Sequence, residues 1–318
     1  MKFCQLSIAS VVLLLIACNG SLPSVNIKGP YTYHQRMDFV TGGFQRSYRV
    51  HVPSAYDGTT PLPLVIVIHG AFDTAKGMEK FSGFSQLSNR ENFIVLYPEG
   101  IGILGYLQHW NAGHCCGKAA DDQIDDVGYL AKAIEDVCLR LSVDRNRIYM
   151  VGFSNGGMMT YRFAAEHTDM LAAAAPIAAS IAGRPNEDAP QWRIPAPKKQ
   201  LPILIMHGLN DDDIPFAGGV SLHRKGERTY ISVEASAQFW IDANGCKDAP
   251  VVANSNDGAV QTITWGTCAD SSMTVLCKID GWGHRWPGPY FTGKLAHDDP
   301  LYRFDAAEMI WSFFKQFP

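Results

Sequence analysis

Residues 148–159 read Ile-Tyr-Met-Val-Gly-Phe-Ser-Asn-Gly-Gly-Met-Met, and this stretch decides the expected fold. A short apolar run leads directly into Gly-Phe-Ser-Asn-Gly, and an apolar helical pattern follows it. The motif G-x-S-x-G places a serine on a sharp turn between a strand and a helix, where the flanking glycines let neighbouring backbone approach closely. We therefore predict that Ser154 is a nucleophile at the end of a buried strand.

Outward from this stretch, apolar runs alternate with helical patterns along the chain. Continuous apolar runs are typical of strands buried on both faces of a parallel sheet. Strands that alternate with helices predict an α/β fold, with a mostly parallel central sheet and helices on both faces. Residues 35–53 instead alternate like an antiparallel hairpin. The runs lie at 64–68, 93–97, 148–151, 203–206 and 273–276, and the helical patterns lie at 126–141, 156–167, 230–243 and 305–317.

Size and charge limit the class of protein. The chain has 318 residues, of which 47% are hydrophobic, enough for one large α/β core. Its formal net charge is −4 with no long run of one sign, which excludes the basic surface of a nucleic-acid-binding protein. We expect a single catalytic domain over residues 35–318, preceded by a short linker at 18–34. The segments 98–122 and 181–200 are expected to be long loops that wall a site.

The first 17 residues predict a targeting signal rather than part of the fold. Lys2 gives a positive start, and residues 8–17 are apolar apart from Ser10, a run too short to span a bilayer as a helix. The run ends Leu-Ile-Ala-Cys at Cys18, which resembles the bacterial lipobox, and an ordinary signal peptide cleaved nearby is the alternative. We expect a secreted, periplasmic or cell-surface protein that touches a membrane only through a lipid anchor on Cys18.

Export changes how the cysteines are interpreted. Besides Cys4 and Cys18 the chain holds six cysteines, and an even number in an oxidising compartment favours disulfides over metal ligands. Cys246 and Cys268 flank a short, turn-rich segment and are the predicted pair. Neither a CxxC pair nor an HExxH motif occurs, so no metal is expected. The sequence leaves open the pairing of Cys115, Cys116, Cys138 and Cys277.

A serine hydroxyl needs a base to become nucleophilic, and His284 is the predicted base. In the hydrolase order of this motif, an acid and then a histidine follow the serine. Only His284 and His297 lie beyond both the serine and the last apolar run, at 273–276. His284 stands just past the last apolar run, in Gly-Trp-Gly-His-Arg-Trp-Pro-Gly, whereas His297 lies in a polar stretch that is typical of a surface loop.

The acid is expected in the loop after the 203–206 run, where residues 211–213 are three aspartates. An acid here would accept a hydrogen bond from the imidazole and fix its tautomer. The first, Asp211, is the predicted acid, and Asp212 and Asp213 are expected to be solvated or to cap a helix.

Two backbone N–H groups are expected to stabilise an oxyanion. One belongs to Asn155, which follows the nucleophile, and the other to Ala71, in the loop after the 64–68 run. His69 begins that loop and is expected to be a structural hydrogen-bonding residue rather than a second base.

With these residues in place, the chain resembles the secreted polyhydroxybutyrate depolymerase and feruloyl esterase families of α/β-hydrolases, from about residue 47 to residue 317. The resemblance supports Asp211 over its neighbours as the acid. It implies acyl transfer from an ester through an acyl-enzyme, without a cofactor. Trp282 and His114 depart from the family pattern, in which small residues are usual. The motifs that carry the resemblance are His69-Gly70, Tyr97-Pro98-Glu99-Gly100, Trp110-Asn111-Ala112-Gly113 with Cys115-Cys116-Gly117, Asp125-Asp126-Val127, Arg147-Ile148-Tyr149, Gly152 to Gly157, His207-Gly208 with Asp211 and Pro215, and Gly283-His284 with Trp286-Pro287-Gly288.

The resemblance implies an ester substrate, either a feruloyl or related ester of a plant polysaccharide or a hydroxyalkanoate oligomer. Trp110, Trp282 and Trp286 are predicted to bind it, because indole rings can stack on a cinnamoyl ring, a sugar face or a polyester unit. Packing in the core is the alternative for Trp110 and Trp286. The competing functions are a peptidase on the same fold and a catalytically silent binding protein.

Overall fold

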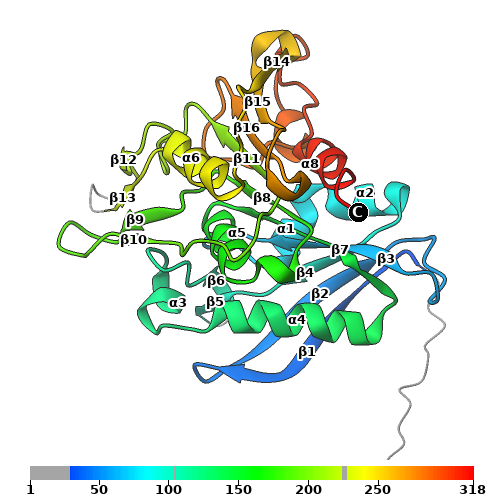
Figure 1. Cartoon of the computed structure of the whole chain (residues 1–318). Coiled ribbons are helices and arrows are strands. Elements are labelled where there is room, and N and C mark those ends of the chain that lie inside the picture. The colour runs from blue at the N-terminus through cyan, green and yellow to red at the C-terminus, as the bar shows by residue number, and fades with distance from the viewer. Residues whose placement is uncertain (1–28, 104, 224–227) are drawn as a thin grey trace, which may run out of the picture.

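A ten-stranded sheet forms the centre of the molecule in a computed structural model that describes residues 29–103, 105–223 and 228–318 (Figure 1). The strand order is β1-β2-β4-β3-β7-β8-β11-β16-β15-β14. The strands from β4 to β16 in this order pair in parallel, and the two strands at each end pair antiparallel. This arrangement confirms the predicted α/β fold. The predicted signal segment and Cys18 lie outside the described residues.

Each predicted apolar run lies in a strand of this sheet, to within one residue at its start. The central strands are almost entirely buried because their runs face helices on both sides. The strands, in sheet order, are β1 Tyr31–Thr41, β2 Phe44–Val52, β4 Ile94–Pro98, β3 Leu62–Ile68, β7 Val143–Phe153, β8 Ala173–Ile177, β11 Ile203–Gly208, β16 Thr274–Ile279, β15 Val260–Trp265 and β14 Val251–Ser255.

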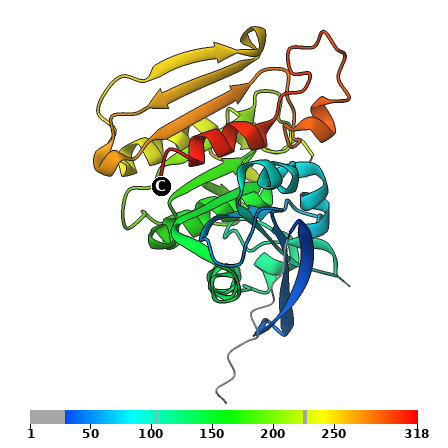
Figure 2. The ribbon, with the colours of Figure 1, turned by 90° about the vertical axis from the view of Figure 1, so that its right-hand side faces the viewer.

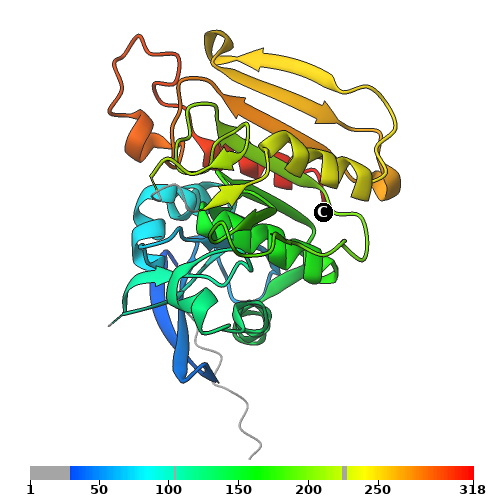
Figure 3. The ribbon, with the colours of Figure 1, turned by 90° about the vertical axis from the view of Figure 1, so that its left-hand side faces the viewer.

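Helices cover both faces of the sheet and enclose two hydrophobic cores. One core holds buried residues of α4 (Asp126–Arg140), α5 (Asn155–Glu166) and α6 (Val233–Ala243). The other holds buried residues of α1 (Ala75–Ser82), α2 (Phe84–Glu91) and α8 (Ala306–Phe314). Figures 2 and 3 show the antiparallel strands β14, β15 and β16 at one end of the molecule and the β1–β2 hairpin at the other.

The hairpin begins earlier than the sequence indicates. The predicted linker at 18–34 is wrong in its last four residues, because β1 begins at Tyr31 and pairs it with Val52. The hydrogen bonds of this pairing fix residues 31–34 as part of the sheet.

The two expected loop segments contain short elements. Segment 98–122 holds β5 (Ile101–Ile103), β6 (Tyr106–His109) and α3 (Gly117–Asp121). Segment 181–200 holds β9 (Ala182–Arg184) and β10 (Trp192–Arg193), which join β12 (Gly219–Val220) and β13 (Thr229–Tyr230) in a small four-stranded sheet. A last short helix, α7 (Pro289–Thr292), precedes α8. Within the described residues, no helix combines the length and the apolar character needed to cross a membrane.

Candidate active site

Ser154 lies on the sharp turn between β7 and α5, as the motif predicts. Its backbone has φ 56° and ψ −122°, a conformation that costs energy for a residue with a side chain and that recurs at functional turns. The Ser154 N–H donates to the Ile177 carbonyl at 2.9 Å. A Cβ atom on Gly156 would collide with the His69 carbonyl oxygen, and one on Gly152 with that of Gly156. The glycines therefore allow the close packing that holds the turn.

The structure brings Ser154, His284 and Asp211 together from three separate loops. The His284 Nε2 atom lies 2.8 Å from Ser154 Oγ, and His284 Nδ1 lies 2.7 Å from Asp211 Oδ2. Because a carboxylate only accepts, Nδ1 carries the proton and Nε2 is free to accept one from the serine. This is the geometry in which a serine hydroxyl can be activated.

Asp211 is held by its own loop. Its Oδ1 atom accepts from the N–H groups of Asp213 at 3.0 Å and Ile214 at 2.8 Å, and its side chain is fully buried. Burial favours the neutral acid, but hydrogen bonds from His207 and His284 outweigh it and hold the Asp211 pKa below its ordinary value. Asp211 is therefore ionised at neutral pH and can stabilise a positive charge on His284.

The predicted oxyanion donors lie at the same pocket. Ala71 and Asn155 line it together with Ser154 and His284. Behind Ala71, the His69 Nδ1 atom donates to the Gly70 carbonyl at 2.7 Å, and Nε2 accepts from the Gly100 N–H at 3.0 Å. Burial lowers the His69 pKa to about 4, so the ring is neutral. His69 thus has the structural hydrogen bonds that the sequence predicts.

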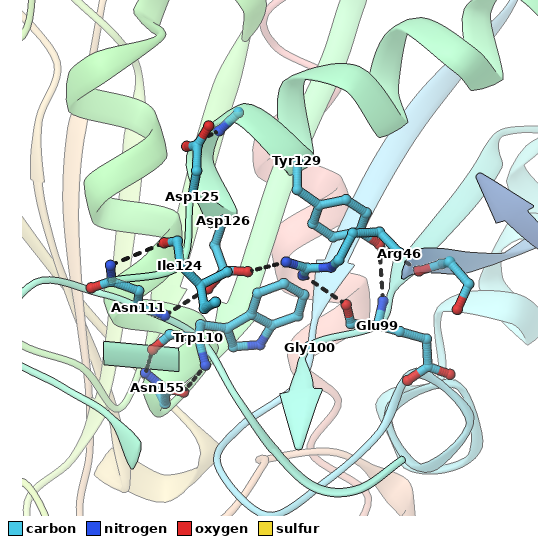
Figure 4. Close-up of polar contacts among 12 residues, drawn as sticks. Arg46, Glu99, Gly100, Trp110, Asn111, Ile124, Asp125, Asp126, Tyr129 and Asn155 are labelled. Atoms are coloured by element: carbon cyan, nitrogen blue, oxygen red, sulfur yellow. Dashed lines mark hydrogen bonds and ion pairs between the residues drawn. The ribbon is translucent and has the colours of Figure 1, made fainter. Parts of the chain in front are cut away.

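A buried polar network lies behind Asn155 (Figure 4). The Asn155 side chain donates through Nδ2 to the Trp110 carbonyl at 3.0 Å and accepts at Oδ1 from the Trp110 N–H at 2.8 Å. The next N–H, of Asn111, donates to Asp126 Oδ2 at 2.7 Å. Asp126 Oδ1 in turn receives the guanidinium of Arg46 at 2.7 Å. The first turn of α5 is thereby tied to the start of α4 and to β2.

The remaining wall of the pocket includes residues that the sequence does not single out. Tyr230 lies in the strand β13, which has only two residues and gave no recognisable pattern, and Arg228 directly precedes that strand. Asp213, predicted to be solvated or a cap, is half-buried and lines the pocket instead. The other lining residues are Cys115, Cys116, Met158 and Ile214.

The predicted substrate-binding role of the three tryptophans is wrong, because their side chains are packed in the interior. Trp110 and Trp286 are 0% exposed and Trp282 is 2% exposed. The Trp110 Nε1–H donates to the His69 carbonyl at 2.9 Å, and the Trp282 Nε1–H donates to the Arg285 carbonyl at 2.8 Å. Trp286 packs against Phe84. None of these rings can stack on a ligand in this arrangement.

The structure contains the predicted disulfide and gives the state of the other described cysteines. Cys246 and Cys268 form the predicted disulfide, and the adjacent Cys115 and Cys116 are joined beside the pocket. Cys138 and Cys277 are free, and burial raises the pKa of the Cys277 thiol to about 12. Among the residues that the structure describes, no group of three or more His, Cys, Asp or Glu side chains is arranged to hold a metal ion.

Comparisons with known proteins agree with this fold. A family model described as phospholipase/carboxylesterase matches residues 58–236, more than half of the chain. Feruloyl esterase B of Piromyces equi is 29% identical over 274 residues, which cover 86% of this chain and 45% of that protein. Poly(3-hydroxyalkanoate) depolymerase C of Paucimonas lemoignei is 30% identical over 268 residues, which cover 82% of this chain and 58% of that protein. This chain therefore spans about half the length of these two relatives.

Among solved structures, an acetyl xylan esterase from Aspergillus awamori superimposes with a TM-score of 0.56 at 18% identity, covering 79% of this chain and 94% of that one. At this identity the likeness bears on the fold alone. The fold is that of the α/β-hydrolases, and the chain belongs to the phospholipase/carboxylesterase family.

Proposed function

We propose that this protein is an extracytoplasmic serine esterase that works through an acyl-enzyme, with Ser154, His284 and Asp211 as its catalytic triad. The observation that carries the proposal is the continuous path of hydrogen bonds from Ser154 Oγ to His284 Nε2 at 2.8 Å and from Nδ1 to Asp211 Oδ2 at 2.7 Å. A peptidase on this fold would use the same triad, so the description of the matching family as phospholipase/carboxylesterase is what favours an esterase. A silent binding protein would not need the triad.

The mechanism follows from these atoms. Ser154 Oγ attacks the ester carbonyl while His284 Nε2 takes the hydroxyl proton, and Asp211 stabilises the imidazolium. The N–H groups of Ala71 and Asn155 stabilise the developing oxyanion. His284 then gives the proton to the leaving alkoxide. Water repeats the sequence on the acyl-enzyme, releases the acid and restores Ser154.

The substrate is proposed to be a feruloyl or related side-chain ester of a polysaccharide, in line with the similarity to a feruloyl esterase. A hydroxyalkanoate oligomer is the second candidate, in line with the similarity to a depolymerase. The burial of Trp110, Trp282 and Trp286 favours this second candidate, because it removes the aromatic platform on which a cinnamoyl ring was expected to stack.

Export is part of the proposal. Residues 1–17 have the composition of a signal peptide, and the Cys246–Cys268 disulfide fits an oxidising compartment. We place a lipid anchor on Cys18 and a single catalytic domain from β1 to α8. Metabolic labelling with a palmitate analogue, compared between the natural chain and Cys18→Ser, tests the anchor.

The decisive experiment compares the purified enzyme with Ser154→Ala on methyl ferulate and on soluble 3-hydroxybutyrate oligomers. We expect turnover of at least one ester by the enzyme, a loss of about 10⁴-fold or more in kcat in the variant, and fluorophosphonate labelling of the enzyme alone. Cleavage of a p-nitroanilide without ester turnover would point to a peptidase. Absence of both turnover and labelling would overturn the proposal.

A further inference from the structure

Arg228 places a positive charge in the wall of the catalytic pocket. It lines this pocket together with Ser154 and His284, and it lies half-buried just before β13. Its charge acts on a neighbouring side chain: burial first and the Arg228 charge second lower the pKa of His114. Met158, Ile214 and Tyr230 line the same pocket, so the cation faces a partly apolar space in which ionic contacts are stronger than in water.

The guanidinium of Arg228 has N–H donors that are not bound to a strong acceptor of the described residues. Its Nη1 atom lies 3.2 Å from Cys115 Sγ and 3.3 Å from Cys116 Sγ, and sulfur is a weak acceptor. Its Nε–H is buried without a hydrogen-bond partner among the described residues. A guanidinium carries five N–H groups in a fork that matches a carboxylate.

No carboxylate of the described chain neutralises this charge. Asp213 lines the same pocket, but its side chain makes no ion pair with Arg228 in the described residues, and its N–H is bound to Asp211 Oδ1 at 3.0 Å. The Asp211 carboxylate is already engaged by His284 and by backbone N–H groups. A partly buried arginine that pairs with no carboxylate of the described residues costs free energy, which an anionic ligand would recover.

We propose that Arg228 determines specificity by binding a carboxylate that the substrate carries close to its scissile ester bond. This inference rests on the proposed esterase function and names its substrate class, namely esters whose alcohol part bears a free carboxylate. Two sources share this chemistry: the terminal carboxylate of a hydroxy-acid oligomer and a uronate of a polysaccharide. In both, a bidentate contact with the guanidinium fixes the distance between the carboxylate and Ser154.

The test uses two pairs of matched substrates. The first pair is the 3-hydroxybutyrate dimer and its primary amide at the terminal carboxyl group. The second pair is feruloyl glucuronate and feruloyl glucose. We expect the enzyme to prefer the carboxylate member of at least one pair by about tenfold to hundredfold in kcat/KM, the range for a hydrogen bond to a charged group. The pair that shows the preference identifies the source.

Three variants test whether Arg228 causes the preference for the carboxylate substrate. Arg228→Gln should abolish the ratio between the two members of the pair, mainly through KM for the carboxylate substrate, and Arg228→Lys should keep part of it. Asp213→Asn removes a negative charge from the pocket and should raise the ratio. Arg145→Gln is the matched control for loss of one positive charge, since Arg145 pairs with Glu135 at the surface. Arg145→Gln should leave the ratio unchanged.

Two results would overturn the inference while the esterase function stands. One is equal kcat/KM for both members of each pair in the natural enzyme. The other is an equal loss on charged and neutral substrates in Arg228→Gln, which would make Arg228 a support for the Cys115–Cys116 wall. Absence of turnover of all four esters would overturn the proposed function and this inference with it.

Discussion

Arg46 is joined to the catalytic site through Asp126, whereas Arg228 lines the catalytic pocket itself, and the two arginines have different surroundings. Arg46 is 2% exposed, donates to Asp126 at 2.7 Å and to the Glu99 carbonyl at 3.0 Å, and its guanidinium carbon lies 3.7 Å from the centre of the Tyr129 ring. Arg228 lines the pocket, and among the described residues its guanidinium donates only to two cysteine sulfurs.

This difference distinguishes an arginine that stabilises the structure behind the site, Arg46, from an arginine that is available to bind a ligand, Arg228. A buried ion pair fixes the segments it joins. The Nε–H groups of Arg46 and Arg228 are alike in being buried without a partner among the described residues, so the two arginines differ in the carboxylate that Arg46 binds and in the pocket that Arg228 lines. Arg46 and Asp126 anchor the segment that begins at Trp110 and ends at the pocket wall of Cys115 and Cys116. Arg228 has no such role among the described residues, so the two arginines should respond differently to mutation.

The largest expected effect comes from removing the partner of Arg46. Asp126→Ala leaves the guanidinium buried and uncompensated, and we expect a loss of about 3–5 kcal/mol in the free energy of unfolding. Urea denaturation at pH 7 measures it. Glu135→Ala, which unpairs the exposed Arg145, should cost about 1 kcal/mol or less, and so should Arg228→Gln. Equal losses for Asp126→Ala and Arg228→Gln would break the distinction between the two arginines.

The next effect concerns the contact between this network and the oxyanion site. Asn155→Leu keeps the backbone N–H but removes both side-chain hydrogen bonds to Trp110. A displaced donor stabilises the transition state less, so we expect kcat to fall about tenfold to hundredfold with little change in KM. Steady-state kinetics and the affinity of a boronic-acid analogue of the transition state should fall together.

Thr160→Val is the matched control for Asn155→Leu. It removes another buried hydrogen bond of α5, from Thr160 Oγ1 to the Gly156 carbonyl at 2.9 Å, and leaves both bonds between Asn155 and Trp110 in place. It should lower the melting temperature without changing kcat. If Asn155→Leu behaves in the same way, the Asn155 side chain supports the fold alone.

Much of the fold could be predicted because the parallel strands are continuous apolar runs. β8 was missed because Ala-Ala-Ala-Pro-Ile has little β propensity, and its neighbours β7 and β11 impose the extended conformation. β14 was missed because all five of its residues are exposed, so it has no buried face to produce a pattern.

The residues of the site likewise divide into those that had a recognisable sequence pattern and those that had none. Ser154, Asp211 and His284 each follow a recognisable strand, so the order of motifs brought out the residues that the structure places within hydrogen-bonding distance. Arg46 had a signal that was overlooked, since it alternates in phase with the buried Tyr48 and Val50 of β2. Arg228 had none, because its place in the pocket depends on how the two-residue β13 pairs with β9.

The same limit explains the error over the tryptophans. An aromatic residue near a catalytic motif has the same sequence signal whether it faces the pocket or the core. Only the packing distinguishes Trp282, whose ring is 2% exposed, from Phe72, which is 50% exposed beside Ala71.

The smallest effect is the contribution of the Arg228 charge to the pKa of His114, which serves as a probe of that charge. Burial first and the Arg228 charge second hold the His114 pKa at about 3, well below the unfolded value of about 6.5. At a pH between these two values, His114 is protonated in the unfolded chain and neutral in the folded chain. The free energy of unfolding therefore falls as the pH falls from about 6.5 towards 3, by about 1.4 kcal/mol per pH unit for this group. His114→Phe keeps a ring against Trp192 and should remove this part of the slope in urea denaturation at pH 6, 5 and 4. Arg228→Gln should raise the His114 pKa and so reduce the loss at the acid end of this range. If His114→Phe removes this part of the slope but Arg228→Gln leaves it unchanged, the charge on Arg228 is neutralised in the folded protein, and the contrast with Arg46 disappears.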